Sequence, residues 1–278
     1  MKNCRTGRGA ILVGIAVLLI AAGANAADKL QIDGSTTVGP IADAFAEAFK
    51  SLHPTCSITV SKTGSGDGVA SLIDSRCSIA MASRFMKEAE FKNAVNNGVL
   101  PVAHVVAMDG VCVVLHPSNP VQALTTDQVR DIYAGKITNW NQVGGVNRPI
   151  VIISRDTSSG TYESFNELVM RKEKMAAGVE YVNSNPQAHA RVRSTEGAIG
   201  YVGLGFLDRY VKTVKLNGVA PSRSTIARGI FPVSRPLFLF TNGYPTLGSM
   251  THAFVTFHLT EQGQEIIESK GFVPRTEY

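Results

Sequence analysis

Short, mostly apolar runs alternate along the chain with segments in which apolar residues recur every three or four positions. The first pattern is typical of buried strands, and the second of helices that pack on one face. Because strand, loop and helix follow one another repeatedly, the pattern predicts parallel α/β sheets. The predicted strands cover residues 29–33, 57–61, 79–82, 102–115, 150–153, 198–202 and 235–240, and the predicted helices cover residues 41–52, 69–75, 87–97, 162–170 and 251–269.

Individual residues mark where two helices begin. Pro40 precedes the helix over residues 41–52 and suits a first helical position, because the N–H that proline lacks would have no intrahelical partner there. Thr125-Thr126-Asp127-Gln128 is a capping-box sequence. It predicts a further helix that carries apolar residues at positions 129, 132 and 133.

The pattern stops at His116-Pro117 and then starts again, and one late strand follows the second set of elements. This order predicts two α/β lobes, of which the second is inserted into the first. Lobe 1 is expected to comprise residues 27–115 and 233–278, and lobe 2 is expected to comprise residues 116–232. The lobes are expected to rotate on ligand binding about the segments near residues 115–120 and 230–235.

The first 26 residues have the plan of a cleaved secretory signal peptide. An apolar run over residues 10–22 is followed by Ala24-Asn25-Ala26, which fits a cleavage site. The run is shorter than the roughly 20 residues needed to cross a bilayer. Cys4 precedes the run instead of closing it, so a lipid anchor is not expected. The basic residues of the start are Lys2, Arg5 and Arg8.

Composition narrows the classes of protein further. The chain is 44% apolar and has a formal net charge of +5, so a disordered chain is not expected. Three basic residues belong to the signal segment, and no cluster of Lys and Arg with interleaved aromatic residues follows it, which argues against nucleic acid as a partner. We expect a soluble protein outside the cytoplasm that is a monomer.

Three loops of one type lead from predicted strands into helices. Residues 35–37, 64–68 and 157–161 are rich in Gly, Ser and Thr, and Arg84 and Arg155 lie close to or within two of these loops. Helix N-termini present N–H groups without intrahelical partners, and hydroxyl groups add donors without adding charge. In open α/β sheets such loops meet at the carboxyl ends of the strands, where ligands bind. Together the loops predict a site for a small oxyanion, although routine N-capping explains any one of them.

The usual signatures of an enzyme are missing from the sequence. No serine has glycines two residues before and after it, no Ser-x-x-Lys occurs, and the glycine-rich loops lack the Gly-Lys-Ser/Thr ending of a nucleotide-binding loop. The six histidines are scattered, without a pair at the spacing of metal ligands on a helix. We therefore expect no catalytic residue, no metal and no cofactor.

Several motifs in a fixed order give the chain a family resemblance. It resembles the phosphate-binding protein of the bacterial high-affinity phosphate ABC importer over essentially all of its length after the signal segment. The most specific motifs are residues 34–38, 63–68, 82–84 and 155–161, and residues 132–140 and 197–201 support them.

The resemblance implies a two-lobed periplasmic-binding-protein fold of type II, with the ligand in the cleft between the lobes. It also implies that the protein captures inorganic phosphate in the periplasm and delivers it to the membrane permease of an ABC importer. Ser158 stands where longer members of the family carry glycine, so its hydroxyl is a further candidate. The resemblance carries the phosphate-binding role onto Thr36, Thr37, Ser65, Arg155, Ser159, Gly160 and Thr161.

One position departs from the longer members of the family, which carry an aspartate that accepts the proton of hydrogen phosphate where this chain has Arg84. Shorter members carry arginine there, and Arg84 is expected to add a charge-assisted bond to the anion. Another carboxylate would then separate phosphate from sulfate, and Asp156 is favoured over Asp67 because it lies in the arginine loop. The alternatives are the same fold binding sulfate or molybdate, or an extracytoplasmic phosphoesterase.

Two of the three later cysteines, Cys56 and Cys77, directly precede strands predicted at the same end of one sheet. The usual strand order would place the first strand between them, but loops folded beneath the sheet edge would let them meet, and an oxidising compartment permits a disulfide. We predict a disulfide between Cys56 and Cys77, and a buried free thiol at Cys112.

Overall fold

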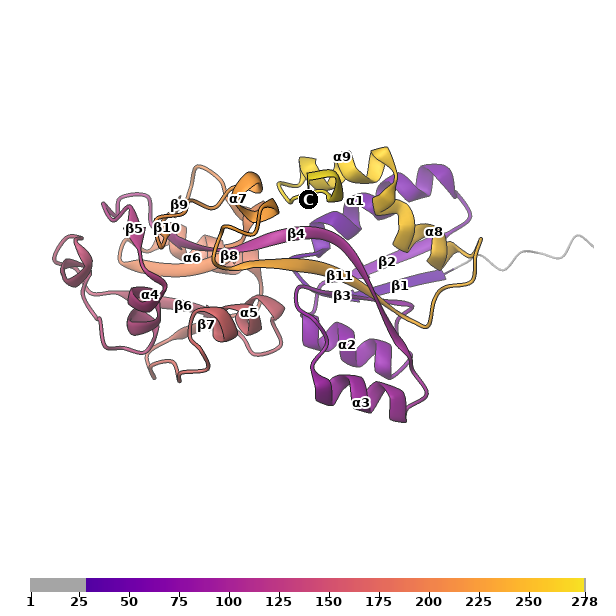
Figure 1. Cartoon of the computed structure of the whole chain (residues 1–278), viewed down its shortest axis with the longest axis horizontal. Helices are drawn as coiled ribbons and strands as arrows, with labels where there is room; N and C mark the ends of the chain where they lie inside the picture. The colour runs from indigo at the N-terminus through magenta and orange to yellow at the C-terminus, as the bar shows by residue number, and fades with distance from the viewer. Residues whose placement is uncertain (1–28, 278) are drawn as a thin grey trace, which may run out of the picture.

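The computed structural model describes residues 29–277, and it shows two lobes joined by two long strands (Figure 1). The predicted signal peptide lies outside the described residues. The first lobe carries β1 (Lys29–Gly34), α1 (Gly39–Leu52), β2 (Ser57–Ser61), α2 (Ser65–Ile73), β3 (Ile79–Ala82) and α3 (Glu88–Asn96), together with α8 (Met250–Thr256) and α9 (Glu261–Ser269) from the end of the chain.

The second lobe is built from the middle of the chain (Figure 1). It contains β5 (Ala123–Leu124), α4 (Thr126–Tyr133), β6 (Val151–Arg155), α5 (Gly160–Leu168), β7 (Glu180–Val182), α6 (Asn185–Ser194), β8 (Ala198–Gly203), β9 (Lys212–Thr213), β10 (Lys215–Leu216) and α7 (Arg223–Ala227). The two joining strands are β4 (Pro101–Leu115) and β11 (Ser234–Asn242).

One continuous sheet runs through both lobes, in the order β2-β1-β3-β11-β4-β8-β6-β7. The outer strands pair in parallel, as the alternation of strands and helices predicts, whereas β11 and β4 are antiparallel to their neighbours. Along β4 the partner changes: β11 pairs with it as far as Gly110, and β8 pairs with it from Val111 onward. The chain therefore passes between the lobes inside strands and not through loops.

Aromatic packing holds the helices of the first lobe on its sheet. Phe45 and Phe49, one helical turn apart on α1, make edge-to-face contacts with Phe254 of α8 and with Phe257, which follows α8. The helices α1, α8 and α9 cover one face of this sheet, and α2 and α3 cover the other (Figure 1). This packing leaves the loops after β1, β2 and β3 facing the second lobe.

The core of the second lobe lies directly behind its cleft loop. Phe165 of α5 stacks on Tyr201 of β8 with ring centroids 4.0 Å apart, and Tyr133 packs against both rings. Trp140 is fully buried and donates its indole N–H to the carbonyl of Gly197. These contacts fix the start of α5 relative to the sheet.

The strands β2 and β3 end where the sequence predicts, but α2 begins at Ser65, four residues before the predicted start at residue 69. The glycines that suggest a loop there serve close packing instead. A Cβ on Gly68 would lie 2.5 Å from Cα of Gly34, so α2 approaches β1 too closely for any side chain.

The predicted disulfide between Cys56 and Cys77 is wrong, because neither residue belongs to a disulfide in this structure. β1 lies between β2 and β3, which puts the two strand starts roughly 10 Å apart at the usual strand spacing. The two side chains also face opposite sides of the sheet: Cys56 belongs to the core under α1, and Cys77 to the core under α2 and α3. Cys112 is a buried free thiol, as predicted.

Candidate anion-binding site

Three helix N-termini meet where the two lobes face each other: those of α1 and α2 from the first lobe and that of α5 from the second. At the first of them, the Ser35 hydroxyl oxygen accepts hydrogen bonds from the N–H groups of Thr37 (3.1 Å) and Val38 (3.3 Å). Gly34 has φ of 131° and a Cβ there would lie 2.2 Å from the carbonyl oxygen of Met81. Only glycine can make this turn beside β3.

The loops of the two lobes touch directly. The Ser65 hydroxyl oxygen accepts from the N–H of Ser83 (3.1 Å), and a Cβ on Gly160 would lie 2.5 Å from that same hydroxyl. The N–H of Gly66 donates to the carbonyl oxygen of Ser158 (2.9 Å), a main-chain bond between the lobes. The structure therefore shows the lobes closed on each other.

At the third loop, the Ser159 side chain caps α5 by accepting from the N–H groups of Thr161 and Tyr162, both at 3.2 Å. Thr161 is fully buried, and its hydroxyl lies 3.0 Å from the Thr37 hydroxyl of the first lobe. The structure thus brings together seven of the predicted ligand-binding residues. Those side chains and backbone groups belong to Thr36, Thr37, Ser65, Arg155, Ser159, Gly160 and Thr161.

Arg155 ends β6 and is only 1% exposed. One terminal nitrogen, Nη2, donates to the Thr36 hydroxyl (3.3 Å) and to the Asn183 carbonyl (2.9 Å), whereas the buried Nη1 has no hydrogen-bond partner. Burial lowers the pKa of Arg155 to about 10, because a charged group loses its hydration. A neighbouring anion would strongly stabilise a buried cation that has an unpaired N–H.

Arg84 lies in a different environment, although its side chain is also mostly buried. Its Nη1 and Nη2 donate to the two carboxylate oxygens of Glu90, at 2.7 Å and 2.6 Å, and Nη1 also donates to the carbonyl of Phe85. Burial acts to raise the pKa of Glu90, but the bonds from Arg84 and from the Lys87 N–H outweigh it and leave the pKa lowered. Of the hydrogen-bonding atoms of Arg84, only Nε is buried without a partner. Its direct bond to an anion stays a prediction.

Asp156 and Asp67, the two carboxylates considered as acceptors of the ligand's proton, also differ in their surroundings. Asp156 accepts with Oδ1 from the N–H (2.9 Å) and the hydroxyl (2.7 Å) of Ser158, while its Oδ2 is buried and has no partner. Asp67 is exposed in the first turn of α2. A buried acceptor without a partner is costly unless a donor approaches it, which supports the preference for Asp156.

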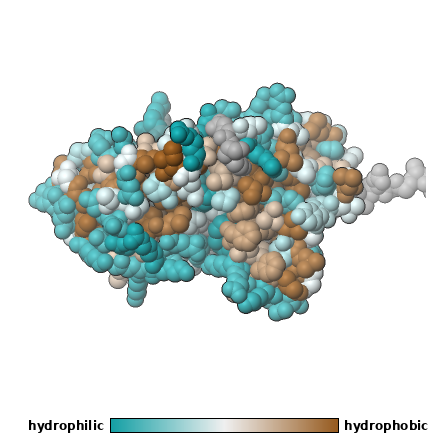
Figure 2. Space-filling model, in the orientation of Figure 1, coloured by the Kyte–Doolittle hydropathy of each residue, from teal (hydrophilic) through white to brown (hydrophobic). Residues whose placement is uncertain are grey.

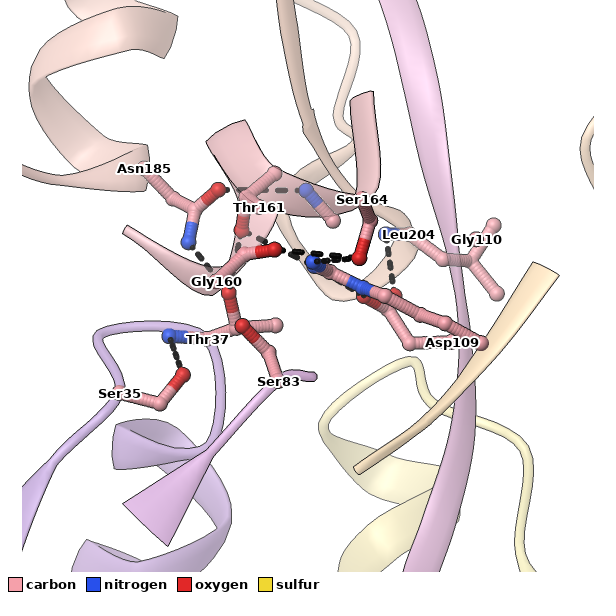
Figure 3. Close-up of polar contacts among 12 residues, drawn as sticks. Ser35, Thr37, Ser83, Asp109, Gly110, Gly160, Thr161, Ser164, Asn185 and Leu204 are labelled. Carbon is pink, nitrogen blue, oxygen red and sulfur yellow. Dashed lines mark hydrogen bonds and ion pairs between the residues drawn. The ribbon is translucent and has the colours of Figure 1, made fainter. Parts of the chain in front are cut away.

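The sequence did not point to Asn185, the first residue of α6, which is fully buried. Its Nδ2 donates to the hydroxyl of Thr37 at 2.9 Å (Figure 3) and to that of Thr36 at 3.3 Å. Its Oδ1 accepts from the N–H of Gly203 (3.3 Å). The helix α6 is rich in polar residues, so the spacing of its apolar residues does not reveal it as a helix. The signal that could have revealed it is Pro186 behind a serine cap, the same kind of start that Pro40 gives to α1.

A second missed group is the buried ion pair of Asp109 (Figure 3) and Arg235, which face each other across β4 and β11. Nε and Nη2 of Arg235 lie 3.0 Å and 2.8 Å from Asp109 Oδ2, and Nη2 also donates to the Thr161 hydroxyl at 3.0 Å. Burial raises the pKa of Asp109, and Arg235 opposes that rise. The pair therefore ties the crossing strands to the start of α5.

The two lobes share one sheet and close on a cluster of buried N–H and hydroxyl donors. This arrangement defines a periplasmic-type binding protein. Residues 20–262 match the family described as the PBP superfamily domain, and the chain belongs to that family. Its resemblance to phosphate-binding proteins is confirmed at the level of sequence: it is 30% identical to the phosphate-binding protein PstS of Bacillus subtilis, over 91% of this chain and 82% of the relative.

Solved structures give the same fold. A putative phosphate ABC transporter substrate-binding protein from Clostridium perfringens, solved with bound phosphate, is 34% identical, with a TM-score of 0.81 over 89% of this chain and 99% of the other. An ABC-type phosphate transport receptor from Vibrio cholerae is 32% identical, with a TM-score of 0.73 over 88% and 99% of the two chains. These similarities confirm the predicted two-lobed α/β fold.

Two further features of residues 29–277 concern membrane-spanning helices and groups of metal-binding side chains. Among residues 29–277 no helix has the length and apolar composition needed to cross a bilayer. In the same range no three side chains of His, Cys, Asp or Glu are grouped so that they could hold a metal ion.

Proposed function

We propose that this protein captures inorganic phosphate outside the cytoplasm and delivers it to the membrane permease of an ABC importer. The observation that carries the proposal is the buried Nη1 of Arg155, which has no hydrogen-bond partner, on a guanidinium group whose Nη2 donates to Thr36 of the other lobe. The relatives named as phosphate-binding proteins, and the Clostridium perfringens structure with bound phosphate, support the same ligand.

The site is made almost entirely of donors, as a phosphate oxygen requires. Backbone N–H groups at the starts of α1, α2 and α5, hydroxyl groups and the guanidinium groups of Arg155 and Arg84 would surround the anion, with the neutral donors spreading its charge. Asp156 Oδ2 would accept the proton of hydrogen phosphate. The proposed ligand-binding residues are Thr36, Thr37, Ser65, Arg84, Arg155, Asp156, Ser158, Ser159, Gly160 and Thr161.

Binding would select the closed arrangement, because donors come from both lobes and are complete only when the lobes meet. The bond from Gly66 to Ser158 and the ion pair of Lys87 with Glu163, at 2.6 Å, join the lobes in this arrangement. The proposal includes lobe boundaries near residues 115 and 232, and a protein that is a monomer. Small-angle scattering with and without phosphate tests the closure, and identical profiles would count against it.

Calorimetry of the purified protein with phosphate, sulfate and molybdate tests the ligand. Tight binding of phosphate alone is the expected result, and equal or tighter binding of sulfate or molybdate would move the assignment to another oxyanion. Hydrolysis of a chromogenic phosphate ester, abolished with Arg155→Ala, would instead support an extracytoplasmic phosphoesterase. Cell fractionation checks the location, where recovery in the cytoplasm would contradict the predicted export.

A further inference from the structure

The three threonine hydroxyls of the site, those of Thr36, Thr37 and Thr161, all receive hydrogen bonds from other side chains of the protein. Thr37 and Thr161 are shown in Figure 3. A hydroxyl has one proton to donate and two lone pairs that accept. The neighbours of its oxygen therefore decide where its proton can go. An amide NH₂ or a guanidinium N–H can only donate, so each one that bonds to a hydroxyl uses a lone pair and leaves the proton available.

At Thr36 both lone pairs are used. The Thr36 hydroxyl oxygen accepts from Asn185 Nδ2 and from Arg155 Nη2, each at 3.3 Å. Neither nitrogen can accept a proton in return. The Thr36 hydroxyl proton must therefore point away from both, toward another acceptor.

Thr37 and Thr161 behave as a pair. Their oxygens lie 3.0 Å apart, Thr37 also accepts from Asn185, and Thr161 also accepts from Arg235. One of the two protons is used between them, in either direction. Whichever hydroxyl accepts that proton then has both lone pairs filled, so its own proton is left for a ligand. The pair thus presents one proton whichever way the bond runs.

The two outer donors are themselves held in a fixed orientation. Gly203 N–H donates to Asn185 Oδ1, which turns the NH₂ group of the amide toward the threonines. Asp109 holds Arg235 through Nε and Nη2, and Asp109 also accepts from the N–H of Leu204 (2.8 Å). Both side chains are buried, so water cannot replace these bonds.

We propose that Asn185 is a positioning residue that directs the hydroxyl proton of Thr36 toward the bound anion and that, together with Arg235, it leaves one proton of the Thr37 and Thr161 pair free for the same anion. The inference rests on the proposed function and deepens it, because it makes selectivity for a ligand that accepts hydrogen bonds depend on an amide that does not touch the ligand.

The first test replaces the NH₂ donor by an acceptor of the same shape. Asn185→Asp keeps the bond from Gly203, but its carboxylate would draw the threonine protons away from the anion. At about pH 8 we expect the phosphate affinity to fall about 100-fold, and at about pH 5.5 we expect much of it to return relative to wild type, since a protonated, buried carboxyl group donates again. Calorimetry at both pH values measures the ratio of the dissociation constants.

A matched control separates this effect from the introduction of any buried carboxylate. Asn119 is also buried, and its Oδ1 accepts from the N–H of Val121 in the loop after β4. Asn119→Asp should leave phosphate affinity unchanged at both pH values. If both variants lose affinity equally, or if the Asn185→Asp ratio does not change with pH, the proposal is wrong.

A neutral variant separates proton direction from charge repulsion. Asn185→Leu removes the donors without adding charge, and we expect roughly a tenfold loss of affinity that does not depend on pH. In a Thr37→Val background, which has no hydroxyl at position 37 to direct, the same substitution should cost clearly less. Equal losses in both backgrounds would overturn the role of Asn185 at Thr37.

Failure of the proposed function would look different. If the wild-type protein binds no phosphate, the ligand assignment itself falls. If the wild type binds phosphate and Asn185→Asp binds it equally well at both pH values, with thermal unfolding showing both proteins folded, only the role of Asn185 falls.

Discussion

Arg84 follows β3 and Arg155 is the last residue of β6, and both lie near the cleft, yet the structure gives them opposite surroundings. Arg84 is bound through both terminal nitrogens to Glu90, whereas Arg155 bonds only to neutral oxygens and keeps Nη1 unpaired. The charge of Arg84 is therefore already balanced inside its own lobe. That of Arg155 is balanced by no ion pair with a carboxylate of residues 29–277, so an anion in the cleft would interact mainly with Arg155.

The difference teaches that position in a motif does not decide whether a charge is available. Glu90 accepts from the N–H of Lys87 and so caps the start of α3, and the same carboxylate neutralises Arg84. The cap and the counter-ion are one side chain. A charged residue in a binding loop therefore has to be judged together with the helix that follows it.

The largest expected effect is at Arg155. Arg155→Ala removes the only uncompensated cation among the proposed ligands, and we expect a loss of affinity of about 3 kcal/mol or more, above 100-fold. Calorimetry with phosphate measures it. Arg84→Ala serves as the comparison, and a loss there as large as that of Arg155→Ala would reverse the contrast between the two arginines.

The next effect concerns selectivity and Asp156. Asn in place of Asp156 can turn its NH₂ toward a sulfate oxygen, whereas a carboxylate repels it. We expect Asp156→Asn to reduce the preference for phosphate over sulfate by about tenfold or more, as the loss of one buried polar interaction implies. Asp67→Asn is the matched control and should leave the preference unchanged. Discrimination retained in the first variant and lost in the second would move the role to Asp67.

A smaller effect is expected from releasing Arg84. Glu90→Gln removes the counter-charge but keeps an oxygen that can accept from Lys87 N–H. We expect phosphate affinity to rise a few-fold and to depend more strongly on ionic strength, since an uncompensated cation then faces the cleft. Titrations at low and high salt measure this. Affinity that is unaltered in both conditions would mean that Arg84 does not act on the anion.

The smallest effect is on stability in acid. The pKa of Glu90 is lowered in the folded protein from its usual value of 4.5, so its contribution is present above about pH 4.5 and is lost as the pH falls through the lowered pKa. Thermal unfolding of wild type and Glu90→Gln should therefore differ near neutral pH and converge in stronger acid. Curves that stay parallel at all pH values would contradict this assignment.

Much of the fold could be predicted from the sequence because strand and helix patterns are local. The Gly, Ser and Thr loops and Arg155 were also evident, since each belongs to a motif that follows a strand. Asn185, Asp109 and Arg235 could not be found in this way. Each acts through a partner far away in the sequence, and their pairing depends on which strands lie side by side.

The error over Cys56 and Cys77 has a related cause. The sequence shows that both precede strands, but the face of the sheet to which each side chain points depends on the helices packed there. The same limit applies to Arg84: its loop was predicted, but its bond to Glu90 follows from how α3 begins beside it.

The strand β4 has a consequence for how the protein unfolds. Its first part pairs with β11 and its last part with β8, so one uninterrupted strand completes the sheets of both lobes. Neither half of β4 can lose its hydrogen bonds without loosening the strand on which the other lobe also depends. The two lobes should thus melt together in one cooperative transition, and a cut on either side of β4 should leave fragments that lack a central strand and do not fold separately.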